Sequence, residues 1–459
     1  MLIKFIKNNI YKIFLILFFL IIIFFRFNNV LNYNSYWGYD GAKHMEYIDS
    51  IEDKYRLPTF TENYLAWHEP LYYFVFAVFG FIYKFITNSN NFILMIKSLQ
   101  ILTAFLDVIF LFIFYKTLSL LTENKSLKLL TLLTTGFFTP LILINNYLTN
   151  ELFLYWLIIL CFYFIVKFDK TGWNYQKIIL VAFLSSLALL TKLSAIIFIF
   201  CFIIWFLYQT IYFKTKIYYK YLLLFIGLVF IINLPWQIYR AKNLGGIFTI
   251  NNYELLQEQE IPQTKDITNK FWFNFDTHIF NNPFWQTGRN SFWSIIFSQT
   301  FIDYDNIGGN VDLNNVQKQV KTGNGRYLSF KTFNWAKIAL KNGFLMLLVV
   351  LFGYALEIKN SFKNKFIPDV NLFLNLFISA SFLALIFNVL KNPFIERGTL
   401  KLIFIISAFP WFFFLSYKNI NNFLQNKKIK FIWLFILGTV IFYSFISLKI
   451  NWVSALPRI

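Results

Sequence analysis

Charged side chains are scarce in this chain. They make up 14% of its 459 residues, where soluble proteins have about 25%, and 58% of the residues are hydrophobic. Apolar runs of roughly 17 to 25 residues, the length that crosses a bilayer as a helix, recur from end to end. Because backbone groups within lipid must be paired inside their own segment, these runs predict helices. The composition excludes an ordinary soluble globular protein and predicts an all-α polytopic membrane protein.

Cysteine is also scarce, since the chain has two, Cys161 and Cys201, both within apolar runs. Two cysteines are too few for a disulfide framework, and we expect no chemistry from them. The sequence shows no repeat with a period of about 20–50 residues. Internal repeats and broken helices near the membrane midplane are typical of many transporters, so their absence counts against a lipid flippase or polysaccharide transporter.

Carboxylates are outnumbered by cations, with 22 Asp and Glu against 42 Lys and Arg, which gives a net charge of +20. Six lysine clusters lie between apolar runs, and such clusters collect on the cytoplasmic side of membrane proteins. We therefore predict an orientation signal with some contact to anionic lipid headgroups, and no nucleic-acid partner. The clusters are Lys4, Lys7, Lys12; Lys116, Lys125, Lys128; Lys167, Lys170, Lys177; Lys214, Lys216, Lys220; Lys359, Lys363, Lys365; and Lys418, Lys427, Lys428, Lys430.

These clusters predict the topology. From a cytoplasmic N-terminus, a retained first helix near 10–30 leads outside, and eleven crossings place the C-terminus outside as well. The stretch 70–86 is apolar too, but counting it as a crossing would put five clusters outside. We therefore interpret it as a helix that enters the outer leaflet and returns. The other ten crossings are expected near 92–115, 127–145, 151–167, 177–191, 193–211, 219–236, 338–356, 370–388, 399–417 and 430–449.

The topology divides the chain into three parts. Residues 1–236 form a transmembrane module with a first outer loop at 31–91, residues 237–337 form a large outer loop, and residues 338–459 form the last transmembrane helices. The large loop is polar and is the one candidate for a small soluble subdomain. Its tryptophans suit either stacking against sugars or anchoring at the membrane interface. They include Trp272, Trp285 and Trp293.

The first outer loop concentrates acidic residues, with seven carboxylates from Asp40 to Glu69 and two of the three histidines, His44 and His68. Glu69 and the following Pro70 suit the start of a helix. His68 is a candidate acid, base or ligand, with a hydrogen-bonding role at the helix start as the alternative.

An amphipathic pattern follows Asp40. Apolar residues recur at threes between residues 42 and 53, which predicts a helix lying on the membrane surface with its apolar face down. Such a helix would hold Asp40 at a fixed depth near the lipid headgroups. We expect Glu52, Asp53 and Glu62 to solvate the surface.

Further charged residues fall at the predicted outer edge of the membrane. Glu151 begins an apolar run, Lys192 interrupts one, and Arg240 and Lys401 flank others, with Arg397 close by. Ionisable groups at such depth are costly and are candidates for function. Carboxylates and cations on one face beside lipid suit a lipid-borne phosphate that a hydroxyl displaces, because cations stabilise the leaving phosphate and a carboxylate accepts the proton. By contrast, we expect a packing or hydrogen-bonding role for the mid-span Asp107.

The motifs resemble those of GT-C superfamily membrane glycosyltransferases, in the protein-mannosyltransferase-like and aminoarabinose-transferase-like branch (families 39 and 83). The resemblance covers roughly residues 10–245. The residues that carry it are Asp40 with His44 and Leu57-Pro58; His68-Glu69-Pro70-Leu71-Tyr72-Tyr73; Asn150-Glu151; Thr191-Lys192; and Pro235-Trp236 with Arg240. The chain departs from the family pattern at Gly41, where many members have a second carboxylate, at Glu69, where they have proline, and at Ile403-Phe404, where they have Arg-Tyr.

The resemblance implies a polyprenyl-phosphate-linked sugar donor and inversion at the anomeric carbon. Asp40 would be the general base, and Lys192, Arg240 and Lys401 would stabilise the departing phosphate. A divalent metal, held by Asp40 and Glu151, is left open. The acceptor would be a lipid, a glycan or a protein, outside a bacterial plasma membrane. The alternatives are a glycan polymerase or ligase that uses diphosphate-linked oligosaccharides, and a transporter.

The lysine clusters generate a first testable prediction. Reporter fusions after Lys125 and after Ile459 are expected to report opposite sides of the membrane, because nine predicted crossings, an odd number, lie between these two positions. If both fusions report the same side, the predicted topology is wrong.

Overall fold

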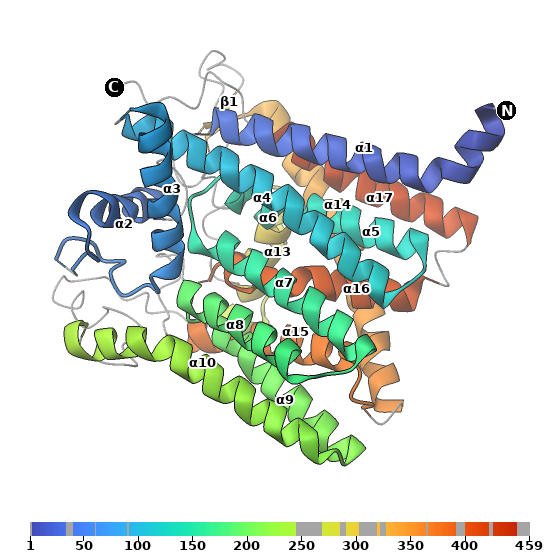
Figure 1. Cartoon of the computed structure of the whole chain (residues 1–459). Coiled ribbons are helices and arrows are strands. Elements are labelled where there is room, and N and C mark those ends of the chain that lie inside the picture. The colour runs from blue at the N-terminus through green and yellow to red at the C-terminus, as the bar shows by residue number, and fades with distance from the viewer. Residues whose placement is uncertain are drawn as a thin grey trace.

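Long helices that run side by side form most of the chain (Figure 1). The structure is a computed structural model. It describes residues 2–33, 40–59, 61–89, 91–244, 269–284, 291–302, 319–321, 327–363, 366–391, 400–421 and 426–447.

Eight helical segments are long and apolar enough to cross a membrane. They are α1 (Leu2–Asn32), α4 (Phe92–Leu121), α7 (Asn150–Thr171), α9 (Ala195–Phe213), α10 (Lys216–Asn243), α14 (Phe330–Lys363), α15 (Val370–Lys391), and η5 (Leu402–Ala408) with α16 (Phe409–Ile420). The prediction of a helical protein with many apolar spans is therefore confirmed. The fold is compatible with an integral multi-pass membrane protein.

The other three predicted crossings are shorter or broken. The run 127–145 is two helices, α5 (Lys125–Gly136) and α6 (Thr139–Ile144), so the single helix predicted there is wrong. Pro140 lies in the first turn of α6, and it could not have continued a helix from α5 because it lacks an N–H. Helix α8 (Tyr175–Thr191) has 17 residues, and α17 (Lys427–Ser447) has an apolar part at Phe431–Ser444. The described residues thus support eight spans by length and not eleven.

Large apolar side chains point outward from the bundle. Examples on α10, α15 and α17 are Leu223, Phe230, Ile231, Phe387 and Phe435, each 63–70% exposed. A water-soluble surface rarely gathers such side chains, whereas lipid tails accept them.

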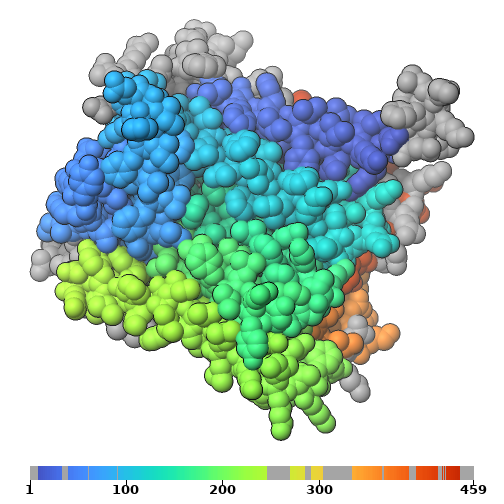
Figure 2. All heavy atoms as spheres, in the orientation of Figure 1, coloured from blue at the N-terminus to red at the C-terminus, as the bar shows by residue number. Residues whose placement is uncertain are grey.

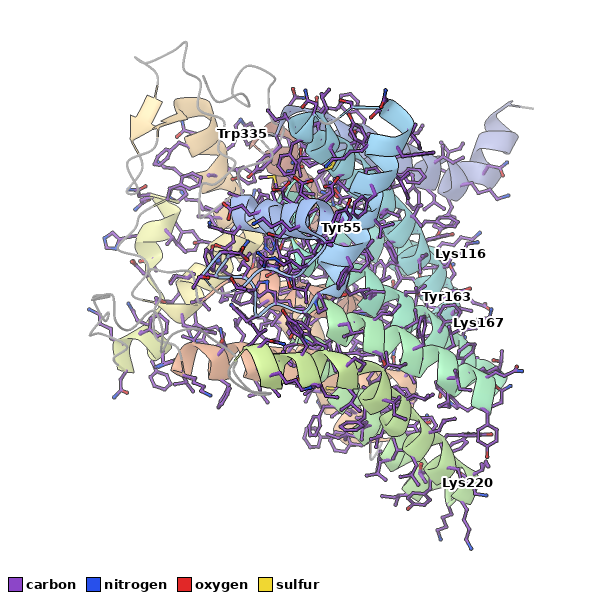
Figure 3. All side chains as sticks on the ribbon, turned by 60° about the vertical axis from the view of Figure 1, so that its left-hand side comes forward. Tyr55, Lys116, Tyr163, Lys167, Lys220 and Trp335 are labelled. Atoms are coloured by element: carbon purple, nitrogen blue, oxygen red, sulfur yellow. The ribbon has the colours of Figure 1, made fainter. Side chains whose placement is uncertain are left out.

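Five of the lysine clusters share one end of the bundle. Lys125 places its ammonium 5.8 Å from the ring centre of Tyr11, and Lys170 donates to the carbonyl of Leu120. Figure 3 shows Lys116, Lys167 and Lys220 on the same side, opposite Trp335 near the start of α14. Gln209, near the end of α9, bonds Asp169 at 3.0 Å and the carbonyl of Pro368 at 2.9 Å. This end therefore also includes the α14–α15 link, and we call it the lysine end.

Helices α2 (Gly41–Lys54) and α3 (Leu71–Thr87) lie at the opposite end, which we call the site end. Figure 1 shows α3 running across the ends of α1, α4 and α7 and not alongside them. Figure 2 shows α2 and α3 (blue) beside the C-terminal part of α10 (lime). The apolar stretch 70–86 thus lies across the long helices in this arrangement, and its interpretation as a helix that enters and leaves the outer leaflet stays a prediction.

The large loop is not a separate subdomain in its described parts. Helices α12 (Asn269–Phe273) and α13 (Phe292–Phe301) and the turn η1 (Thr277–Phe280) bury Phe271, Ile279 and Phe297 in the same core as the long helices. Strands β1 (Gln319–Lys321) and β2 (Tyr327–Ser329) pair in an antiparallel hairpin before α14. The soluble subdomain predicted for 237–337 is therefore wrong for these segments, because their aromatic side chains pack inward.

The tryptophans of this loop differ in placement. Trp293 is 48% exposed and donates its indole N–H to the carbonyl of Trp272 at 2.8 Å, whereas Trp272 itself is partly buried. Trp285 lies outside the described residues. Of the two described, Trp293 has the more accessible ring.

An ion pair joins α1 to α4 inside the bundle. The Nε of Arg26 lies 2.9 Å from Oδ2 of Asp107, and both side chains are 0% exposed. Arg26 also donates to the carbonyl of Gly136 at 3.1 Å, and the indole of Trp156 donates to Asp107 at 3.4 Å. The hydrogen-bonding role expected for Asp107 is confirmed, and the α5–α6 break supplies the free carbonyl.

The second prediction follows from this pair. Asp107→Ala is expected to lower the free energy of unfolding in detergent by about 3–5 kcal/mol, because it leaves the buried Arg26 guanidinium without its counter-charge. The double variant Arg26→Met/Asp107→Leu is the matched control and should recover most of that loss. A single variant as stable as the parent protein would contradict this role for the pair.

Candidate active site

Asp40 lies immediately before α2, at its N-cap position. Its backbone is left-handed, with φ 56° and ψ 20°, a region that non-glycine residues seldom occupy and that is enriched at functional sites. The side chain is exposed, and the hydroxyl of Tyr64 donates to Oδ1 at 2.6 Å. One carboxylate oxygen is thereby held by a neutral phenol, while Oδ2 makes no hydrogen bond to the described residues.

The amphipathic helix predicted after Asp40 is confirmed as α2, but its apolar face does not point into lipid. Met45, Ile48 and Ile51 are buried against α3, in a cluster that contains Tyr73 and Phe76. The prediction that the helix rests its apolar face on the membrane is wrong, since a neighbouring helix covers that face. The position of Asp40 therefore depends on α3.

Glu52 contradicts the expectation of a surface carboxylate. It is 2% exposed, and its Oε1 lies 2.9 Å from the ammonium of Lys84 on α3. Burial raises its pKa, and Lys84 opposes that shift. A side chain at Gly80 would come within 2.7 Å of the Glu52 carboxylate, so glycine makes the room for this pair. Asp53 is exposed, as expected.

Glu62 is exposed as well, and it pairs with Arg56 at 2.5 Å. This hydrogen-bonded pair holds the pKa of Glu62 well below its usual range. Glu62 and Arg56 thus stabilise the turn between α2 and α3, at a distance from the buried site groups.

The two histidines of the first outer loop, His44 and His68, both contact the hydroxyl of Tyr73. His44 Nδ1 lies 2.9 Å and His68 Nδ1 lies 3.0 Å from the hydroxyl of Tyr73. Both rings are buried, with centroids 5.8 Å apart. The amide of Asn150, at the start of α7, reaches His68 Nδ1 at 3.3 Å. Residues from α2, the loop, α3 and α7 thus form one buried polar cluster.

Lys192 follows the last residue of α8, and its ammonium lies 2.6 Å from Oε1 of Glu151 in the first turn of α7. The positive start of α7 favours the Glu151 carboxylate there. Thr149 donates to the other oxygen of Glu151. The Lys192 side chain is 17% exposed, and its ammonium lies 5.4 Å from the ring centre of Phe404.

Arg240 and Glu69 form a second, deeper pair at this end. Their Nη1 and Oε1 atoms are 3.5 Å apart, and their side chains are 1% and 3% exposed. Burial raises the pKa of Glu69, and the Arg240 charge opposes that shift. The guanidinium of Arg240 is therefore buried and does not face an open surface. It can affect the site through its electrostatic potential.

The remaining candidates lie near enough to His44 for their charges to affect its pKa. These charges are on Asp40, Glu151, Lys192 and Lys401. The largest influence is burial, and the pKa of His44 is lowered to about 4. Lys401 immediately precedes η5 and is partly buried. Arg397 lies outside the described residues. The structure therefore gathers the predicted candidates that it describes at the site end.

A metal held jointly by Asp40 and Glu151 does not fit these contacts. Both Glu151 oxygens are engaged by Lys192 and Thr149, and Oδ1 of Asp40 accepts from Tyr64. Within the described ranges, no three His, Cys, Asp or Glu side chains lie together as metal ligands. We derive no step through a metal.

A small pocket lies beside Lys192, and the part of it that a water molecule can enter measures about 20 Å³. It lies between α7, α9, α15 and η5, and Ser194 and Phe404 connect it to the lysine. Its lining is mostly apolar: Leu154, Ile158, Ser194, Ala195, Ile197, Phe198, Phe377, Ser381, Phe404, Ile405, Ser407 and Ala408. A volume of this size holds about one water molecule.

Sequence reasoning missed the contacts of three neutral side chains, which are Tyr64 on Asp40, Tyr73 between the histidines, and Phe404 over Lys192. Tyr73 belongs to a motif that the sequence does show, but its hydroxyl partners are not adjacent in the chain. Tyr64 and Phe404 carry no signal of their own. No protein-family model, curated protein sequence or solved structure matches this chain.

Proposed function

We propose that this chain is an integral-membrane inverting glycosyltransferase of the GT-C type. It moves a sugar from a polyprenyl-phosphate-linked donor to an acceptor hydroxyl, at the outer face of a bacterial plasma membrane. The observation that carries the proposal is that an exposed carboxylate, Asp40, and a partly exposed cation, Lys192, both lie at one end of an apolar bundle. The lysine end would then face the cytoplasm.

Asp40 performs the proton transfer in this proposal. Its Oδ1 accepts from Tyr64, so Oδ2 accepts the proton of the acceptor hydroxyl. The acceptor oxygen attacks the anomeric carbon as the bond from that carbon to the phosphate oxygen breaks on the opposite side. A single displacement of this kind inverts the anomeric centre.

Lys192 stabilises the charge on the departing phosphate. An ammonium has three N–H donors, and its contacts with Glu151 at 2.6 Å and Asn150 at 3.5 Å use two. The third can reach a donor phosphate without breaking the pair with Glu151. Arg240 and Lys401 add positive potential from behind, which is worth more in a site of low dielectric constant than in water.

The apolar side chains beside Lys192 suit the part of the lipid nearest the phosphate. Phe404 lies against the ammonium of Lys192, so the phosphate and the first isoprenyl carbons would meet at its ring. The acceptor is a lipid, glycan or protein hydroxyl on the Asp40 side.

Purified protein in detergent, given a panel of labelled polyprenyl-phosphate sugars, tests the proposal. Transfer to an added acceptor or to water marks a transferase, and inverted product stereochemistry marks the single displacement. Binding without turnover would instead indicate a carrier. Turnover of a diphosphate-linked oligosaccharide alone would indicate a polymerase or ligase.

The third prediction concerns Asp40→Asn. This variant keeps the shape and hydrogen bonding of the side chain but removes the base, so turnover should fall about 10²- to 10⁴-fold with donor binding largely intact. Glu46→Gln and Asp53→Asn are matched exposed controls on α2 and should be near normal. Glu52→Gln is not such a control, because Glu52 is buried against Lys84.

Variants of His68 and Glu69 test whether another residue is the general base. If His68→Ala or Glu69→Gln abolishes turnover in a folded protein while Asp40→Asn retains most of it, the base is not Asp40.

The fourth prediction concerns Lys192. Lys192→Ala should weaken donor binding and turnover together, whereas Lys192→Arg should recover part of both, because it restores the positive charge with a different shape. Isothermal binding of a polyprenyl-phosphate sugar and initial rates measure the two effects. A folded Lys192→Ala protein with unchanged kinetics would show that this lysine has no part in donor recognition.

A further inference from the structure

Buried hydrogen bonds form a continuous chain from the turn of Asp40 to Lys192. The backbone N–H of His44 donates to the carbonyl of Asp40 at 2.9 Å, and the His44 ring contacts Tyr73. Tyr73 contacts His68, and His68 contacts Asn150. Asn150 in turn accepts from the ammonium of Lys192 at 3.5 Å.

The amide of Asn150 has one orientation that satisfies its neighbours. Its Oδ1 faces the ammonium of Lys192, which can only donate, and its Nδ2 faces the carbonyl of Thr191, which can only accept. Nδ2 is therefore the atom that lies 3.3 Å from Nδ1 of His68, and it donates to that nitrogen. It follows that His68 carries no proton on Nδ1.

The protons of the remaining groups follow from this assignment. Because His68 Nδ1 is unprotonated, its 3.0 Å contact with Tyr73 has the phenol as donor. The single lone pair of this nitrogen is then shared between the phenol and the longer contact with Asn150. A phenol has one proton to give, so Tyr73 accepts from His44 at their 2.9 Å contact. His44 is then protonated on Nδ1, and His68 on Nε2.

We propose that Tyr73 is a positioning residue: its single hydroxyl holds His44 and His68 in opposite tautomers and, through Asn150, couples the turn that carries Asp40 to the ammonium of Lys192. The role in turnover rests on the proposed function, whereas the tautomers do not.

The surroundings favour neutral rings in this chain of hydrogen bonds. Burial lowers the pKa of both histidines, and Lys192 lowers that of His68 further. A neutral histidine has one ring nitrogen that donates and one that accepts, which is what a directional chain requires. Tyr73 itself is held by its ring, which stacks on Tyr47 with centroids 3.7 Å apart.

Removal of the Tyr73 hydroxyl tests the inference with little change in packing. Tyr73→Phe keeps the ring stacked on Tyr47 and deletes both imidazole contacts. Tyr47→Phe and Tyr72→Phe are matched controls, because each deletes a buried hydroxyl that has no hydrogen-bond partner within the described part of the chain.

The first readout is ¹⁵N NMR of protein labelled on histidine. The chain has three histidines, and His278, which is 82% exposed, serves as the internal reference. We expect one buried ring with its proton on Nδ1 and one with its proton on Nε2, assigned by single His→Gln substitutions. Tyr73→Phe should change the signals of both buried rings, and the two controls should not. Identical tautomers in the parent protein, or signals unmoved by Tyr73→Phe, would overturn the inference.

The second readout is kinetic. Tyr73→Phe should lower kcat by about 10- to 100-fold, the scale of a small misplacement of reacting groups, with the KM for the lipid-linked donor nearly unchanged. Turnover by Tyr73→Phe equal to that of the controls would overturn the positioning role. Opposite tautomers in a parent protein that transfers no sugar would contradict the proposed function instead, so the two failures are distinguishable.

Discussion

The pair of Arg26 and Asp107 is the contact on which the remaining arrangement depends. Two charges with no exposed surface are stable only as partners, so α1 and α4 are fixed relative to each other at that depth. The same pair also contacts the α5–α6 break and α7. Arg26 donates to the carbonyl of Gly136, and the indole of Trp156 donates to Asp107. Further along, Lys97 of α4 donates to the carbonyls of Val30, near the end of α1, and of Tyr33, just after it. The end of α1 is therefore fixed against α4.

Charge pairing also organises the site end. Lys192 is paired with Glu151, Arg240 with Glu69, and Lys84 with Glu52. In surroundings of low dielectric constant each member would be strongly disfavoured without its partner. Asp40 differs, because it is exposed and its described side-chain partner is a neutral phenol.

The apolar runs predicted most helices, because lipid permits few other ways to satisfy a backbone. They failed where tertiary contact decides the outcome. The run 127–145 is mostly apolar, and Pro140 is the sign that two helices form it. In the large loop, polar composition suggested a soluble subdomain, but the aromatic residues of α13 pack into the main core. A composition average does not say which face of a segment is covered.

The candidate site shows the same division. Asp40, Glu151 and Lys192 were predictable because charged residues beside apolar runs are conspicuous. Glu52 was not, since its burial depends on Lys84, which is distant in the chain, and on the missing side chain of Gly80.

The cover of α2 by α3 has a consequence for how the protein meets different membranes. Met45 and Ile48 pack against the side chains of α3 and not against acyl chains. The position of Asp40 along the membrane normal is therefore set by protein packing. A thicker or thinner bilayer would move the headgroups relative to Asp40, but it would leave the separation of Asp40 and Lys192 unchanged. Bilayer thickness would then govern how readily a lipid-borne molecule reaches the site, while the spacing of the groups that act on it would stay the same.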